Sequence, residues 1–149
     1  MSDPLEALAK ELEASPDYRV LRRFVPPSRY HEGDGSPTAT GVVVDVETTG
    51  LDPSRDKIIE FCGVPFEFER ESGRILAVRE AVSYLEDPGR PIPAEVTKLT
   101  GITDAMVAGK RIDEAAVGNL LADVGLIIAH NAAFDRPFVD RRLPASRDK

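Results

Sequence analysis

The chain has 149 residues, of which 42% are hydrophobic and 30% charged, and its net charge is −7. That length supports one ordinary hydrophobic core, and the acidic balance argues against a broad duplex-binding surface, which needs many lysines and arginines. A small footprint on a strand end remains compatible with this charge. No apolar stretch reaches the length of a membrane helix and the start does not resemble a signal peptide, so we expect a cytoplasmic protein.

The first part of the chain reads as an extension. Leucines recur at helical spacing between Leu5 and Leu12, which predicts a helix. A second short helix is predicted from Tyr18 to Phe24, ending before two prolines. Residues 28–40 are rich in glycine, serine and proline and indicate a linker. We expect this extension either to cap the following domain or to dock on a partner.

Two carboxylates follow the apolar run Val42–Val44. Asp45 and Glu47 are two residues apart on a predicted strand, so their side chains point to the same face. Like charges at this separation repel unless a cation or a proton lies between them. Oxygen ligands favour Mg²⁺ or Mn²⁺ over Zn²⁺. The simpler alternative is a strand that ends in two solvated acids.

The next four residues are Thr48, Thr49, Gly50 and Leu51. Gly50 permits a tight turn, in which backbone N–H groups and hydroxyls can face a phosphate. The elements expected after this turn are strands over 57–68 and 74–84, helices over 94–99 and 112–123, and a strand over 125–129. The two strands after the turn form an antiparallel pair, with an irregularity indicated at Pro65. We expect Glu60 either to lie on the wetter face of the sheet or to pair with a basic residue, rather than to be a ligand.

A third acid follows the apolar strand over 125–129, in the segment His130 to Asp135. We expect this strand to return beside the first, which would bring Asp135 close to the earlier acid pair. Pro137 predicts that the last helix starts near Arg136 or kinks there.

The two motifs, Asp-x-Glu-Thr-Thr-Gly-Leu and His-Asn-Ala-Ala-Phe-Asp after a strand, together resemble the DEDD superfamily of 3′–5′ exonucleases. This superfamily includes RNase T and the proofreading, epsilon-like subunit of bacterial DNA polymerase III. The resemblance covers residues 41 to about 142, with support from 56–60 and 99–103. It implies a ribonuclease H-like α/β fold, with three antiparallel strands extended by a parallel one and helices on the faces.

The resemblance also implies an activity. Asp45, Glu47 and Asp135 would hold two Mg²⁺ or Mn²⁺ ions and serve hydrolysis of the terminal phosphodiester, releasing nucleoside 5′-monophosphates. The implied partners are 3′ ends of DNA or RNA, and a polymerase or another replication or repair protein. The residues expected to contact the substrate are Thr48, Thr49, Gly50, Leu51, His130, Asn131 and Phe134.

The family's third motif, His-x-x-x-x-Asp, supplies a fourth acid and a general base, and it should follow well after the second. His130 and Asp135 have the right spacing, but the preceding strand identifies them as the second motif. We therefore expect residues 1–40 to be a helical extension with a linker, and residues 41–149 to be an exonuclease-like domain that is incomplete at its C-terminus. An open sheet edge should then be covered by the N-terminal helices or by association between chains.

Three other interpretations remain. The chain could be an inactive exonuclease-fold module that binds nucleic-acid ends or a polymerase. It could be a haloacid dehalogenase-like phosphatase, although the second acid is Glu47 rather than aspartate and no later lysine and acidic pair fits. The acids could also be surface charge alone. The sequence does not separate DNA from RNA, or proofreading from trimming.

Overall fold

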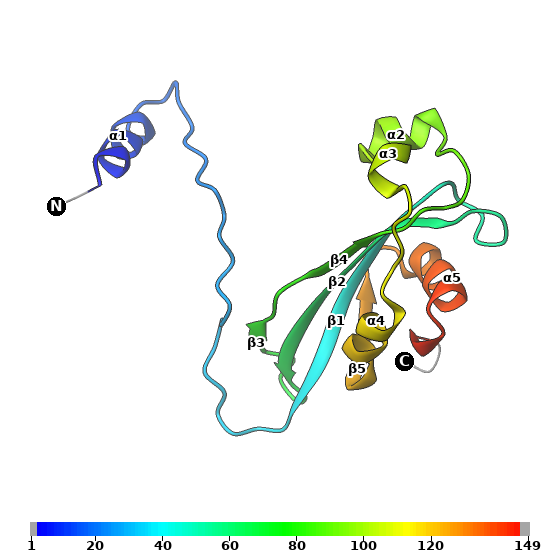
Figure 1. The fold of residues 1–149 in the computed structure, drawn as a ribbon. Helices are drawn as coiled ribbons and strands as arrows, with labels where there is room; N and C mark the ends of the chain where they lie inside the picture. The colour runs from blue at the N-terminus through cyan, green and yellow to red at the C-terminus, as the bar shows by residue number, and fades with distance from the viewer. Residues whose placement is uncertain (1–2, 147–149) are drawn as a thin grey trace.

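The computed structural model describes residues 3–146, with an N-terminal arm that reaches away from an α/β domain (Figure 1). The chain order is α1 (Pro4–Glu13), β1 (Thr38–Thr48), β2 (Ile58–Glu69), β3 (Ile75–Val78), β4 (Val82–Leu85), α2 (Ala94–Thr100), α3 (Asp104–Val107), α4 (Glu114–Ala122), β5 (Val124–Ala129), α5 (Ala132–Arg142) and the 3₁₀ turn η1 (Pro144–Ser146). No helix in the described range is long and apolar enough to cross a membrane.

The strands form one mixed sheet in the order β3-β2-β1-β5, and β4 pairs with the same edge of β2 as β3. β1 is antiparallel to β2 and parallel to β5. The parallel pairing requires a crossover, which α2, α3 and α4 provide. The predicted arrangement of antiparallel strands extended by a parallel one is confirmed, and β5 does return beside β1.

The core lies between the sheet and the helices α4 and α5. Side chains alternate along β1, so Val42, Val44 and Val46 point into this layer. They pack with Leu121 of α4 and Phe138 of α5. Burial of one such side chain stabilises the fold by about 2 kcal/mol. This packing fixes α5 against β1 and β5, and α5 carries the third acid.

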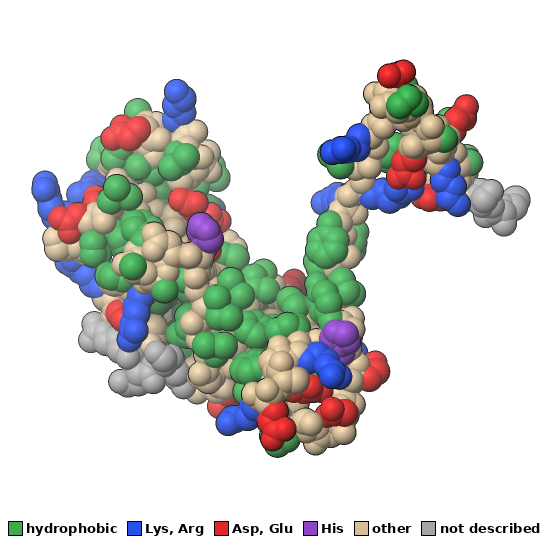
Figure 2. Space-filling model, turned by 180° about the vertical axis from the view of Figure 1, so that it is seen from behind, with side chains coloured by type: hydrophobic (Ala, Val, Ile, Leu, Met, Phe, Trp, Pro, Cys, Tyr) green, Lys and Arg blue, Asp and Glu red, His purple; other side chains and the backbone are tan. Residues whose placement is uncertain are grey.

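On the opposite face of the sheet, β1 and β5 carry an exposed apolar patch. Val43, Leu126 and Ile128 each remain 41% exposed there. Val43 is the register partner of Ile128, so these side chains form one patch. Figure 2 shows hydrophobic side chains gathered over the middle of this face.

The predicted second N-terminal helix is wrong. Residues 18–27 are extended, and Tyr18, Leu21 and Phe24 are exposed. A short helix is only marginally stable unless it buries an apolar face, and this segment has no surface to pack against.

The predicted strand over 74–84 is divided into β3 and β4. β2 pairs with β3 through Phe66 and with β4 through Gly63, and Pro65 lies between these points. Proline has no N–H to donate to the neighbouring strand, so the ladder is interrupted there. Only its carbonyl is used, accepting a bond from the Arg79 N–H at 2.9 Å. The predicted irregularity at Pro65 is confirmed.

The last helix begins at Ala132, so the predicted start near Arg136 is wrong, and Pro137 lies inside the helix. The alternative prediction, a kink at this proline, stays a prediction. The carbonyl of Asn131 accepts bonds from the N–H groups of Phe134 and Asp135, at 2.8 and 3.0 Å, and so starts the first turn. Proline at 137 removes only the bond that would run back to the carbonyl of Ala133. The remaining contacts of α5 with the core hold the helix in place.

The linker meets the sheet edge before it reaches β1. Arg29 forms an isolated bridge with Ala77 of β3, and the N–H of Tyr30 donates to the carbonyl of Leu76 at 2.7 Å. An extended strip of the N-terminal arm, rather than its helix, therefore covers part of this edge. Helix α1 stands apart from the sheet (Figure 1), with Leu5 and Leu8 exposed.

Candidate active site

Asp45 and Glu47 lie near the C-terminal end of β1, on the face of the sheet opposite to α5. The alternation of β1 gives both side chains the same direction, as predicted. Asp45 is exposed and Glu47 is partly buried. Glu60 of β2 is the direct register partner of Glu47, so a third carboxylate adjoins the pair.

These carboxylates act on one another. The pKa of Glu47 is raised above its ordinary value, first by burial and then by the negative charges of Asp45, Glu60 and Asp135. The charge of Asp135 therefore reaches Glu47, although it comes from a different element. A divalent cation would relieve this repulsion, and carboxylate oxygens are the ligands that Mg²⁺ prefers.

Asp135 lies in the first turn of α5 and is only 3% exposed. It lines a small cavity of about 120 Å³ with Val44, Ala129 and Asp140, among others. The parallel return of β5 delivers α5 to this position beside β1.

Over residues 3–146, no group of three or more acidic, histidine or cysteine side chains is arranged closely enough to hold a metal ion. Asp45 and Glu47 are neighbours on β1. The charge of Asp135 contributes to the raised pKa of Glu47, but among the described residues the three side chains do not form a group that could hold a metal ion. The donor chemistry of the pair nevertheless suits Mg²⁺ or Mn²⁺.

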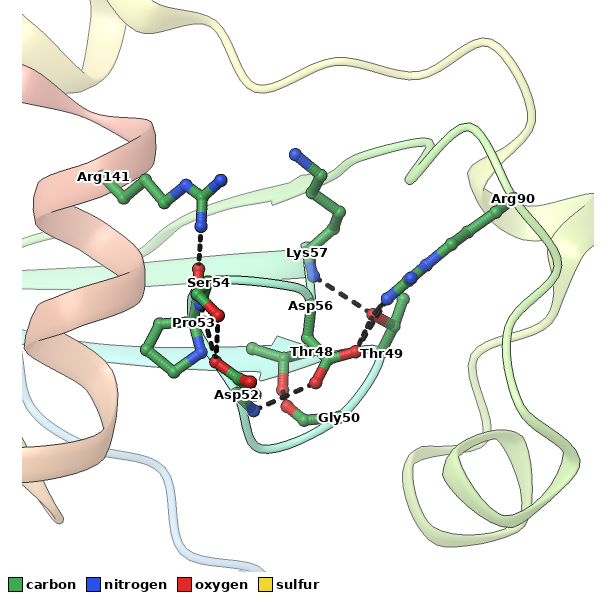
Figure 3. Close-up of polar contacts among 10 residues, drawn as sticks. All are labelled: Thr48, Thr49, Gly50, Asp52, Pro53, Ser54, Asp56, Lys57, Arg90 and Arg141. Carbon is green, nitrogen blue, oxygen red and sulfur yellow. Dashed lines mark hydrogen bonds and ion pairs between the residues drawn. The ribbon is translucent and has the colours of Figure 1, made fainter.

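The turn after Glu47 is held by its own side chains (Figure 3). The hydroxyl of Thr48 donates to the carbonyl of Gly50 at 2.6 Å. The hydroxyl of Thr49 donates to Asp56 Oδ1 at 3.2 Å and accepts from the Lys57 N–H at 3.1 Å. Both hydroxyls thus have internal partners, and their predicted contacts with a nucleotide stay predictions.

Gly50 and Leu51 occupy the tip of this turn. A Cβ at Gly50 would lie 2.5 Å from Asp56 Oδ2, so the close approach of that carboxylate requires glycine. The same oxygen accepts the Asp52 N–H at 3.0 Å. Leu51 is 82% exposed, which leaves its side chain available to pack against a base.

Arg90 reaches the turn from the connection between β4 and α2. Its Nη2 donates to Thr49 Oγ1 and to Asp56 Oδ1, each at 2.7 Å. The pKa of Asp56 is lowered, chiefly by the Asp52 N–H, with further contributions from Thr49 and Arg90. Arg90 could not be identified from the sequence, because nothing local to it indicates a contact with Thr49, 41 residues away.

Three further predicted residues lie at the start of α5. His130 and Asn131 are exposed, and Asn131 occupies the N-cap position without a side-chain capping bond. Phe134 is partly buried, with its ring centroid 5.1 Å from that of Phe138. Their roles as substrate contacts stay predictions.

Residues 42–144 match the family model described as RNase_T, Exonuclease, and the chain belongs to this exonuclease family. It is 40% identical over 108 residues to the PolC-type DNA polymerase III of Listeria welshimeri, covering 71% of this chain and 7% of that protein. It is 41% identical over 112 residues to a DNA polymerase III subunit epsilon-like protein of Rhodobacter capsulatus, covering 69% of this chain and 14% of that protein. The chain thus spans a small part of these relatives.

Solved structures show the same fold. An exonuclease I from Methylocaldum szegediense superposes with a TM-score of 0.55 at 24% identity, over 70% of this chain and 23% of that one. Escherichia coli exonuclease I in complex with a dT13 oligonucleotide superposes with a TM-score of 0.53 at 22% identity, over 67% and 22%. The expected ribonuclease H-like fold is confirmed.

Proposed function

We propose that this chain is the catalytic part of a metal-dependent 3′–5′ exonuclease that removes nucleoside 5′-monophosphates from DNA or RNA. The observation that carries the proposal is the acid pair of Asp45 and Glu47, which share one face of β1 near its C-terminal end. The negative charge of Asp135 contributes to the raised pKa of Glu47. Membership of the exonuclease family supports the same conclusion.

The proposed ligands of two Mg²⁺ or Mn²⁺ ions are Asp45, Glu47 and Asp135. When bound, such ions supply an activated water and stabilise the departing 3′ oxygen. The chain's own residues bind and orient the strand end. In this proposal Leu51, which is exposed at the tip of the turn, packs on the terminal base, and the backbone of the 48–57 turn binds its phosphate. Asp135, from the first turn of α5, would be the third carboxylate ligand.

The relatives suggest the setting of this activity. Those compared above are named as DNA polymerase III proteins, which supports a polymerase partner and work in the cytoplasm. One structural neighbour was solved in complex with a DNA oligonucleotide, which is consistent with DNA as one of the proposed substrates.

The test is a cleavage assay on a 5′-labelled single strand with Mn²⁺. In the complete protein, the wild type should shorten the strand stepwise from the 3′ end, and Asp45→Asn should lose at least about 100-fold in rate, because Asp45 is a proposed metal ligand. Circular dichroism should show an unchanged fold. Asp123→Asn, at an exposed acid after α4, is the matched control and should keep the wild-type rate. Equal rates for Asp45→Asn and wild type would refute the assignment.

A second function is favoured by one observation: the described acids are not assembled into a metal-holding group. In that case the chain is an exonuclease-fold module that holds nucleic-acid ends or a polymerase without cutting. It would bind the same oligonucleotide with no product in Mn²⁺, and Asp45→Asn would bind as wild type does.

A further inference from the structure

Arg90 connects the segment between β4 and α2 to the turn that follows Glu47. It belongs to the connection that precedes α2, and both of its acceptors belong to the turn that follows Glu47. In Figure 3 the guanidinium points into this turn from the side, towards Thr49 and Asp56.

The bonds around Asp56 form a closed set. Its Oδ1 accepts from Arg90 Nη2 and from the Thr49 hydroxyl, and its Oδ2 accepts the Asp52 N–H. Its own N–H donates to the carbonyl of Asp52 at 2.7 Å. Charge-assisted bonds of this kind are stronger than neutral ones. The Asp56 carboxylate therefore holds two positions of the 48–57 turn, Thr49 and Asp52, and Arg90 holds the carboxylate in place.

The position of this loop determines what a strand end would meet. The register of β1 against β2 shifts between Glu47 and Thr48, and β1 ends at Thr48, so the chain leaves the sheet one residue after the second acid. Leu51 then stands exposed at the tip. An exposed apolar side chain on a free loop would lose conformational entropy on binding a base, and a loop that is already held avoids much of that cost.

We propose that Arg90 is a positioning residue, which through Thr49 and Asp56 holds the 48–57 turn in the shape that receives the terminal nucleotide. The inference rests on the proposed function, because it names how that site binds the strand end. It predicts that loss of Arg90 weakens binding of the strand without weakening binding of the metal.

The experiment measures binding of a 5′-fluorescein single-stranded oligonucleotide by anisotropy in Ca²⁺, binding of Mn²⁺ by calorimetry, and cleavage in Mn²⁺. Arg90→Ala and Asp56→Asn should each weaken oligonucleotide binding about tenfold, as expected for loss of a charged hydrogen bond. KM should rise by a similar factor with kcat and Mn²⁺ affinity within about twofold. Arg90→Lys, which keeps a donor for the same acceptors, should recover most of the affinity.

Arg29→Ala is the matched control, since Arg29 is similarly exposed and pairs with Glu32 far from the turn. It should bind the oligonucleotide as wild type does. All measurements are made below the unfolding transition of each variant, where the variants are folded. If Arg90 contributed only to the stability of the fold, its loss would then leave the oligonucleotide affinity unchanged. Wild-type affinity in Arg90→Ala would overturn this inference alone, whereas a wild-type protein that neither binds nor cleaves the strand would overturn the proposed function beneath it.

Discussion

Glu47 lies among three other carboxylates, and this crowding is the feature of a single residue with the most direct consequence. Burial and the charges of Asp45, Glu60 and Asp135 all raise its pKa. Because the pKa of Glu47 is raised in the folded protein, ionisation of this carboxyl in the absence of a cation destabilises the fold. The same property makes the position receptive to a divalent ion.

Replacement of Glu47 by glutamine should therefore change how stability depends on pH. Glu47 has an ordinary value of 4.5, and its pKa is higher in the folded protein. The stability that protonated Glu47 contributes is present below pH 4.5 and is lost as pH rises through the raised value. In chelator, the free energy of unfolding of Glu47→Gln minus that of wild type should grow between pH 4 and pH 7. Thermal unfolding measures this difference, and parallel pH profiles would contradict it.

Gly50 gives a second prediction for a single residue. An alanine Cβ there would lie 2.5 Å from Asp56 Oδ2, a carboxylate held by several bonds. Gly50→Ala should therefore destabilise the protein by about 1–3 kcal/mol. Gly118→Ala is the matched control, because a Cβ at this position of α4 meets nothing within 4 Å. It should stabilise the protein by about 0.5–1 kcal/mol, the helix propensity gained. Urea unfolding of both variants measures these effects, and similar values for the two would contradict the crowding at Gly50.

At the scale of helices and strands, the sequence predicted what short-range patterns determine. Alternation along β1 placed Asp45 and Glu47 on one face, and the apolar strand before His130 indicated the parallel return. The sequence did not predict contacts between residues that are distant along the chain. Examples are the pairing of Glu60 with Glu47 and the hydrogen bond from Arg90 to Asp56. Propensity alone also failed from Tyr18 to Phe24, where no surface is available to bury the apolar side chains.

Helix α5 is fixed by an ion-pair network at its C-terminal end. Arg142 donates to both carboxylate oxygens of Glu86, at 2.8 and 2.9 Å, and to Glu114 of α4 at 2.6 Å. Glu86 is buried, so removal of Arg142 would leave an unpaired charge inside the protein. This network links the helix that carries Asp135 to two neighbouring segments.

Arg142→Ala should accordingly destabilise the fold by about 3 kcal/mol. Arg136→Ala, which removes an exposed pair with Asp140 on the same helix, should cost only about 0.3–0.5 kcal/mol. Chemical denaturation compares the two. Equal losses would show that the Glu86 pair does not hold α5.

At the scale of the whole molecule, several apolar surfaces face solvent in the described structure, and two of them lie on regular elements of the sheet and of α1. One is the patch of Val43, Leu126 and Ile128 on the sheet, and the other is the leucine stripe of α1. Exposed patches of this kind usually mark contact surfaces. The association between chains expected from the sequence stays a prediction.

Light scattering after size-exclusion chromatography tests that prediction. The measured mass should exceed the 16.2 kDa of one chain as concentration rises. Leu126→Lys, which puts a charge in the patch away from the acids, should lower the average mass at equal concentration. A monomer at every concentration for both proteins would contradict association through this face.

The central claim is that the carboxylates at 45, 47 and 135 gather at divalent ions. Anomalous diffraction from crystals grown with Mn²⁺ and a nucleoside 5′-monophosphate tests it most directly. We expect manganese about 2.0–2.3 Å from oxygens of Asp45 and Glu47, with Asp135 ligating an ion directly or through a bound water. Manganese absent from this pair, or an Asp135 side chain still turned into its own cavity away from every ion, would contradict it.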